Sequence, residues 1–161
     1  MKAVYITKYG GSDQLVYGTL QRPEPKSGQV LVRVRAAAVN PRDWILRDGR
    51  YVFKFALPRF PIILGSDFSG DVVKCGPSAS QFRIGDEVFG MQPLFGGMGA
   101  YAEYVAIDDT ALAVGGGRNL HRYGGRILHT RTGWRLCEQS GSRRCTGGSN
   151  ECCYVTIWSE V

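Results

Sequence analysis

The chain has 161 residues, a length typical of one globular domain, and 43% of them are apolar. Its net charge of +6 is uneven, because residues 1–114 carry 13 basic and 11 acidic side chains, whereas residues 115–161 carry seven and three. The first part therefore needs no nucleic-acid partner to explain its charge. The sequence shows neither a bilayer-spanning stretch nor a signal peptide, so we expect a cytoplasmic protein without a membrane partner.

Short strands are the first elements expected along the chain. In residues 30–36, Val32, Val34 and Ala36 alternate with Arg33 and Arg35, which is typical of a half-buried antiparallel strand. Closely spaced short strands favour a mainly β domain, built as a barrel or a sandwich. The further strands expected, each bounded by glycine or proline, are Val4–Thr7, Phe68–Val73, Glu87–Met91 and Tyr101–Ile107.

One short helix is indicated between the second and third of these strands. Asn40 suits the N-cap, Pro41 the first helical position and Asp43 the first turn, where the positive end of the helix favours a carboxylate. Trp44 is the first apolar residue of the expected helix, and Gly49 is expected to end it.

Residues 115–161 have a different composition from residues 1–114. They contain nine glycines, seven arginines and four of the five cysteines, with no apolar periodicity. We expect this tail to be disordered or loosely packed, and interpret it as the product of a frame change or an alternative exon. An RNA-binding arginine and glycine tail is a weaker alternative, because aromatic residues are sparse and the arginines form no repeat.

Residues 1–114 also carry an ordered set of motifs. Their sequence resembles the N-terminal catalytic domain of the medium-chain dehydrogenase/reductase superfamily, in its zinc-independent quinone oxidoreductase (zeta-crystallin-like) branch. The resemblance implies a GroES-like (chaperonin-10-like), partly open β-barrel with one or two short helices. The motifs that carry it are Asn40–Asp43, Gly49–Tyr51, Pro61–Gly65, Gly65–Gly76, Gly85–Gly90 and Gly99–Tyr104.

The resemblance implies a reaction in which NADPH reduces a quinone or an enone. The family uses a second, Rossmann-type domain for the dinucleotide, and 161 residues leave no room for one. Gly97–Ala102 matches a G-x-G-x-x-A pattern, but a strand-like segment follows it where a dinucleotide turn requires a helix. We therefore expect a truncated catalytic domain that is inactive alone. Self-association is a further expectation, because segments that normally pack on the second domain would be exposed. The alternative function is a non-enzymatic binding module or a competitor that pairs with a full-length relative.

The same resemblance argues against zinc. Zinc-dependent relatives carry cysteine where this chain has Asn40 and histidine where it has Ser66, and neither residue present is a competent zinc ligand. Carbonyl polarisation must then come from hydrogen-bond donors. Family position places the Asn40 amide and the Tyr51 hydroxyl, as catalytic groups, where nicotinamide and substrate meet, with Asn40 making a partial cofactor contact.

Each remaining candidate has an alternative reading. Asp43 holds the helix start that presents Asn40, although capping alone also explains both residues. Tyr51 is otherwise a half-buried surface aromatic. The substrate pocket is expected to include Trp44, Ser66 and Asp67, together with Leu57–Phe60; otherwise Trp44 packs in the core and Asp67 is a turn residue.

Overall fold

The computed structural model describes residues 1–50, 59–93, 98–115, 127–130 and 133–136. The described part contains one α-helix, α1 (Pro41–Arg47), and two short 3-10 helices, η1 (Ser12–Gln14) and η3 (Asp109–Ala111). The strands are β1 (Lys2–Ile6), β2 (Val16–Thr19), β3 (Gln29–Ala37), β4 (Ile62–Ile63), β5 (Asp67–Cys75), β6 (Glu87–Met91), β7 (Tyr104–Asp108), β8 (Leu112–Val114), β9 (Ile127–Thr130) and β10 (Gly133–Leu136).

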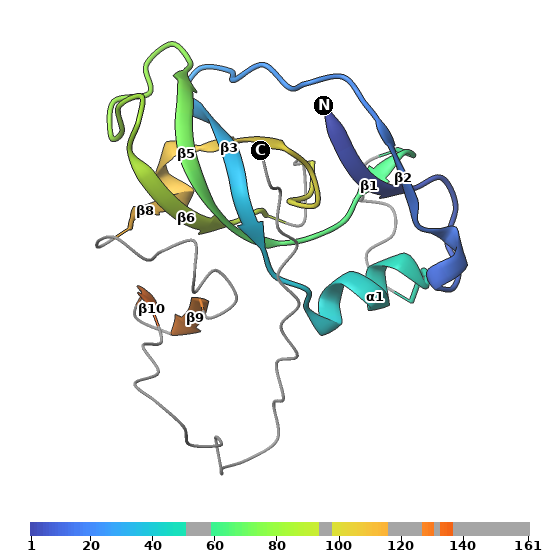
Figure 1. Ribbon diagram of the computed structural model, residues 1–161. Coiled ribbons are helices and arrows are strands. Elements are labelled where there is room, and N and C mark those ends of the chain that lie inside the picture. Colours follow the sequence, from blue (N-terminus) through green and yellow to red (C-terminus); the bar gives the residue numbers. More distant parts are fainter. Residues whose placement is uncertain (51–58, 94–97, 116–126, 131–132, 137–161) are drawn as a thin grey trace.

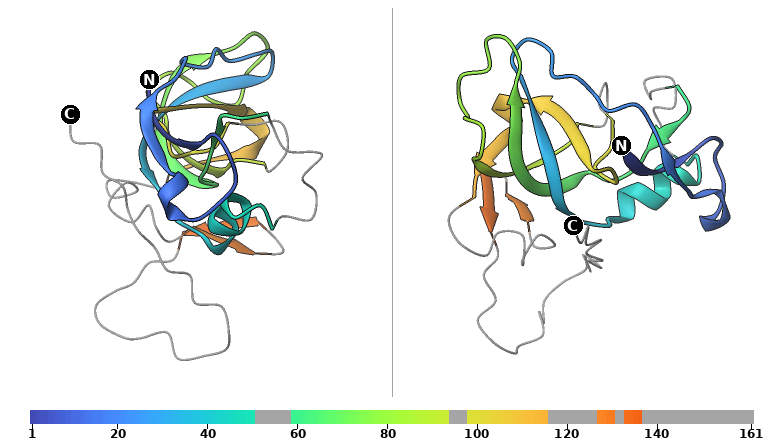
Figure 2. Two further views of the ribbon diagram at one scale, coloured as in Figure 1. Left: turned by 90° about the vertical axis from the view of Figure 1, so that its right-hand side faces the viewer. Right: turned by 45° about the horizontal axis from the view of Figure 1, so that its top comes forward.

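These strands form three antiparallel sheets. The largest has the order β7-β3-β5-β6-β8, a smaller one has the order β2-β1-β4, and β9 pairs with β10. The five-stranded sheet and the three-stranded sheet lie beside each other, and α1 follows the end of β3 along their lower edge (Figure 1). The views in Figure 2 show both sheets curving around the interior between them.

Strand β3 is an internal strand of the five-stranded sheet, because it pairs with both β5 and β7. The alternation expected from sequence is confirmed in its middle, where Val32 and Val34 are buried and Arg33 is exposed. At the start of the strand the neighbouring Leu31 is buried as well, so β3 is half-buried only further along. Its last pair with β5 is Ala37 with Phe68, which brings the helix start beside the start of β5.

Two buried clusters stabilise the domain. The larger lies on the five-stranded sheet and includes Val32, Phe68 and Val88, all fully buried. The smaller joins α1 to the three-stranded sheet through Leu46, Ile6, Ile62 and Leu64. The Tyr101 side chain packs, partly buried, against both clusters and so connects them.

The mainly β class and the short helix expected from sequence are confirmed, but the sheets do not close into a barrel. The last expected strand is wrong at its start. Residue 101 lies before β7, because its backbone bonds to Leu64 and Val4 instead of entering the five-stranded sheet. Strands β2, β4, β8, β9 and β10 were not expected. In the part of the chain that the structure describes, no helix has the length and apolar character needed to cross a membrane.

Most of the tail, residues 115–161, lies outside the described residues, so its expected disorder remains a prediction. Beyond Gly115 the structure describes only β9 and β10, whose register pairs Gly133 with Thr130 and Leu136 with Ile127.

A paired valine substitution tests the core of the five-stranded sheet. Val88 on β6 is fully buried, whereas its partner on β8, Val114, is 65% exposed. We expect Val88→Ala to lower the free energy of unfolding by about 2 kcal/mol, because two buried methyl groups are lost. Val114→Ala should cost less than about 0.5 kcal/mol. Urea unfolding of both variants measures the difference, and equal costs would contradict this assignment of the core.

Candidate functional site

The candidate site begins at the first turn of α1. Asn40 and Asp43 occupy the N-cap and N3 positions of a capping box, and Pro41 stands at the first helical position, as predicted. The Asn40 backbone N–H donates to Asp43 Oδ2 at 2.8 Å, and the Asp43 N–H donates to the Asn40 carbonyl. The helix ends at Arg47, and the following Gly49 has a φ of +73°, the left-handed conformation that terminates helices.

The Asp43 carboxylate is buried and is satisfied by hydrogen-bond donors from three segments. Besides the Asn40 N–H, the Tyr101 hydroxyl donates to Oδ2 at 2.9 Å, and the Ser66 hydroxyl donates to Oδ1 at 3.3 Å. A buried carboxylate with fewer partners would cost several kcal/mol in lost hydration, so these donors are what allows it to remain there.

Burial shifts two pKa values in this cluster. Loss of hydration raises the pKa of Asp43 above its usual range, against the lowering effect of its hydrogen bonds and of the Arg42 charge. Burial also raises the pKa of Tyr101 strongly, and the neighbouring Asp43 and Asp67 charges add to that shift. The tyrosine is therefore a neutral donor throughout the physiological range.

The Asn40 side chain is fixed by a second carboxylate. Its Nδ2 donates to Asp67 Oδ2, while the Asp67 backbone carbonyl accepts from Ala38 N–H at 3.0 Å. Asp67 opens strand β5, so the interpretation of this residue as part of a turn is wrong. Because Asn40 follows β3 and Asp67 begins β5, the pairing of these two strands brings the amide and the carboxylate together.

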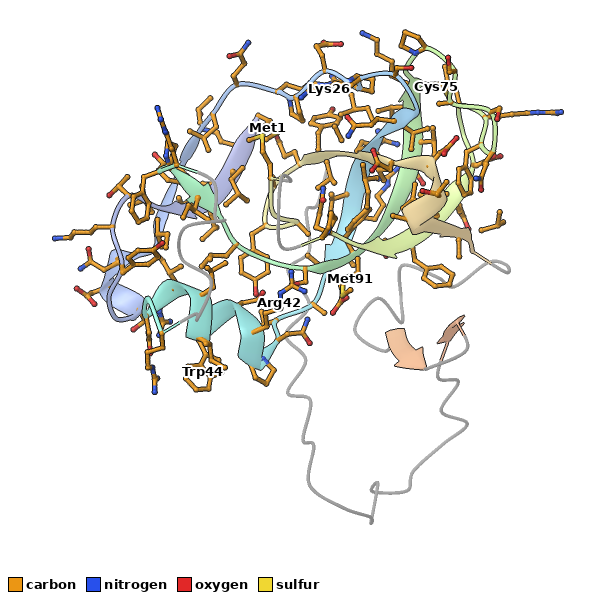
Figure 3. All side chains as sticks on the ribbon, turned by 180° about the vertical axis from the view of Figure 1, so that it is seen from behind. Met1, Lys26, Arg42, Trp44, Cys75 and Met91 are labelled. Atoms are coloured by element: carbon orange, nitrogen blue, oxygen red, sulfur yellow. The ribbon has the colours of Figure 1, made fainter. Side chains whose placement is uncertain are left out.

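Arg42 connects α1 to the end of β6. Its guanidinium group lies 3.9 Å from Met91 Sδ and donates to the Gln92 carbonyl at 3.4 Å. Arg42 and Met91 are labelled in Figure 3. The Gln92 side chain is itself buried and donates to the Ala106 carbonyl on β7. The helix start is thus bound to the five-stranded sheet at two places, through Asn40 and through Arg42.

The remaining predicted site residues are placed differently. Trp44 is 42% exposed on the outer side of α1, with the Arg50 guanidinium carbon 5.0 Å from its ring centroid, so its expected core packing is wrong (Figure 3). The helix turns it away from the sheets because the neighbouring Asp43 faces them. Its role in a pocket remains a prediction. Tyr51 and residues 57–58 lie outside the described residues, and Phe60 is exposed.

Tyr101 is the site residue that the sequence did not indicate. It was assigned to a strand, where its hydroxyl has no reason to meet an aspartate 58 positions earlier. The available signal was the adjacent glycine motif. Gly65 has a φ of +89°, and a Cβ there would overlap the Tyr101 ring, so glycine leaves the space that the ring occupies.

Neither a metal site nor a dinucleotide turn is found in the described ranges. Within these ranges no three His, Cys, Asp or Glu side chains are grouped to hold a metal ion. The described part of the Gly97–Ala102 pattern leads into β7, not into a helix. Gly99 packs against the backbone carbonyls of Ile63 and Leu64, so its glycine serves close packing within the domain.

A comparison with protein families decides the classification. The model of the alcohol dehydrogenase GroES-like domain matches residues 26–116. The chain belongs to this family. The matched segment covers α1 and the whole five-stranded sheet. It also includes every site residue described above.

Individual relatives of this GroES-like domain are oxidoreductases. The chain is 36% identical to the mitochondrial NAD(P)H oxidoreductase of Dictyostelium discoideum over 71% of its own length and 33% of that protein. It is 40% identical to the quinone oxidoreductase of Sus scrofa, over 68% of this chain and 32% of that one. It therefore spans about a third of the length of the curated relatives it matches.

Solved structures agree with this relationship. The quinone oxidoreductase of Coxiella burnetii superimposes with a TM-score of 0.66 at 32% identity, over 71% of this chain and 36% of that one. A mycobacterial protein solved in complex with NADPH gives a TM-score of 0.61 at 29% identity, over 72% and 32% of the two chains. The predicted membership of the medium-chain dehydrogenase/reductase superfamily, beside its quinone oxidoreductases, is confirmed.

The raised pKa of Asp43 predicts a pH-dependent difference in stability. An acid whose folded pKa is raised stabilises the fold below its unfolded pKa, and that contribution is lost as the pH rises through the folded pKa. The wild-type chain should therefore lose stability relative to Asp43→Asn as the pH rises from below about 4 toward neutrality. Urea unfolding over that range measures the difference.

Asp48→Asn provides a control of opposite sign. Hydrogen bonds from Arg47 and Arg50 lower the pKa of Asp48, so its contribution is present above the unfolded pKa and is lost as the pH falls. The wild-type chain should gain stability relative to Asp48→Asn as the pH rises. Identical pH profiles for the two variants would contradict the burial argument for Asp43.

Proposed function

We propose that residues 1–114 are the catalytic domain of a zinc-independent oxidoreductase that reduces a quinone or a conjugated enone with NADPH. The observation that carries this proposal is the Asn40 amide, fixed at the start of α1 between two carboxylates. Its backbone N–H donates to Asp43 and its side chain donates to Asp67. Family membership and the oxidoreductase relatives support the reaction class.

Asn40 is suited to polarise a carbonyl group. A primary amide carries two N–H donors, and Asp67 accepts from the nitrogen that bears both of them. A donor held rigidly by its neighbours stabilises developing negative charge without first having to reorganise. In this proposal Asn40 takes the place of a Lewis-acid metal, and Tyr51 supplies a second hydrogen-bond donor. Asp43 holds the Asn40 backbone N–H, and Asp67 holds its side-chain amide.

Bound NADPH would supply the hydride, and this chain's own residues would bind and orient the substrate carbonyl. We propose that residues 1–114 do this only together with a dinucleotide-binding domain. Two observations support that part of the proposal. In the described ranges Asn40 is the one residue that the family position assigns to the cofactor, and Gly99, the described glycine of the G-x-G-x-x-A pattern, packs against the backbone carbonyls of Ile63 and Leu64.

Turnover by the isolated chain tests this requirement. We expect no saturable NADPH oxidation in the presence of a quinone, because binding and hydride orientation need the second domain. The measurement is NADPH absorbance during titration with quinone, with a full-length quinone oxidoreductase as the positive control. Saturable oxidation by the chain alone would overturn this part of the proposal.

A chimeric enzyme tests the catalytic assignment. Residues 1–114 would replace the matching segment of the pig quinone oxidoreductase, to which the chain is 40% identical. We expect the chimera to reduce quinone, and Asn40→Ala within it to lower kcat by about 100-fold, the cost of losing one positioned donor. Ile84→Ala, at a site 71% exposed, is the matched control and should leave kcat unchanged.

A folded chimera without activity, or an Asn40→Ala variant with full kcat, would rule out the catalytic assignment. The binding-module alternative would then be tested by pull-down of a full-length relative on the immobilised 161-residue chain.

A further inference from the structure

We propose that Tyr101 is a positioning residue, whose hydroxyl fixes the Asn40 amide through the shared oxygen of Asp43. This inference deepens the proposed function and rests on its assignment of Asn40. The geometry is a chain of three groups, in which Asp43 Oδ2 accepts from the Tyr101 hydroxyl at 2.9 Å and from the Asn40 N–H at 2.8 Å. The position of that one oxygen therefore determines where the Asn40 backbone lies.

Tyr101 is held in place independently of α1. Its backbone N–H donates to the Leu64 carbonyl at 2.9 Å, and its own carbonyl accepts from Val4 N–H at 2.7 Å. Its ring occupies the space beside Gly65 that a Cβ would fill. The contacts with β1 and with the β4–β5 connection therefore fix the position of the Tyr101 hydroxyl.

Asn40, by contrast, belongs to the connection between β3 and α1, and its contacts there divide into two anchors. The side-chain anchor is Asp67 at the start of β5, which the β3–β5 pairing sets. The backbone anchor is Asp43, which lies on the same short helix and cannot by itself fix that helix relative to the sheets. Tyr101 holds Oδ2 from outside the helix, and Ser66 holds Oδ1 from outside it as well.

The two donors to Asp43 differ in what they control. Ser66 reaches the oxygen that Asn40 does not use, at the longer distance of 3.3 Å. Tyr101 reaches the oxygen that Asn40 uses. Loss of the tyrosine hydroxyl therefore leaves Oδ2 with the Asn40 N–H as its partner among the described residues. The carboxylate is then restrained from outside the helix by the longer Ser66 contact on Oδ1, so it turns about its bond more easily and carries Asn40 with it.

Nuclear magnetic resonance of the 161-residue chain tests this positioning role without cofactor or substrate. We expect Tyr101→Phe to shift the Asn40 backbone and side-chain amide resonances by more than their line widths. Hydrogen exchange at the Asn40 backbone N–H should become about tenfold faster, the effect of weakening one hydrogen bond to a charged group. A merely structural role would lower the melting temperature without moving these signals.

Two matched variants separate the alternatives. Tyr104→Phe removes a hydroxyl from β7, where the ring lies against Arg22, and should leave the Asn40 signals unchanged. Ser66→Ala should affect them less than Tyr101→Phe does. If Tyr101→Phe does not fold, 3-fluorotyrosine at position 101 retains the hydroxyl as a stronger donor and should shift the Asn40 N–H resonance away from its wild-type position.

Asn40 signals that respond to Tyr101→Phe no more than to Tyr104→Phe would overturn the inference, as would unchanged signals with 3-fluorotyrosine. The outcome is distinct from that of the catalytic test, because an inactive chimera would refute the role of Asn40 in catalysis while leaving these resonance shifts intact.

Discussion

The burial of one carboxylate is the constraint on which the candidate site depends. Asp43 is removed from water at the start of a seven-residue helix, and only donors from three separate segments compensate for its lost hydration. Those segments are the β3–α1 connection, the β4–β5 connection and the residues before β7. The two sheets and the helix must therefore be assembled together before the carboxylate is satisfied, and the same assembly positions Asn40.

Local sequence was sufficient to predict the helix start. The N-cap, the proline and the first-turn aspartate lie within four residues, and the forces that act on them are local. The long strands were also predictable, β3 from the alternation in its middle, and β5 and β6 from the glycines that lie beside their ends. The resemblance to a known domain then provided the fold type, a GroES-like domain, which periodicity alone does not give.

Contacts between distant residues were not predictable in the same way. The hydroxyl of Tyr101 meets Asp43 across 58 positions, and only the folded arrangement brings them together. Strand β4 has two residues and β8 has three, which is too short for an alternation to be visible. Core packing was the alternative expected for Trp44, but its position one residue after Asp43 turns it about 100° around α1, toward solvent.

The location of the site on the β3–β5 pair has a consequence for its dynamics. This pair extends over seven register positions and ends at Ala37 and Phe68, beside Asn40 and Asp67, whereas the outer strands β2 and β8 are short and carry exposed residues. Local opening of a protein starts where few buried contacts hold the chain, and it reaches central strands last. The Asn40–Asp67 contact, which lies beside the end of this pair, should therefore open less readily than the edges of both sheets, and the donor should remain preorganised while those edges fray and re-form around it.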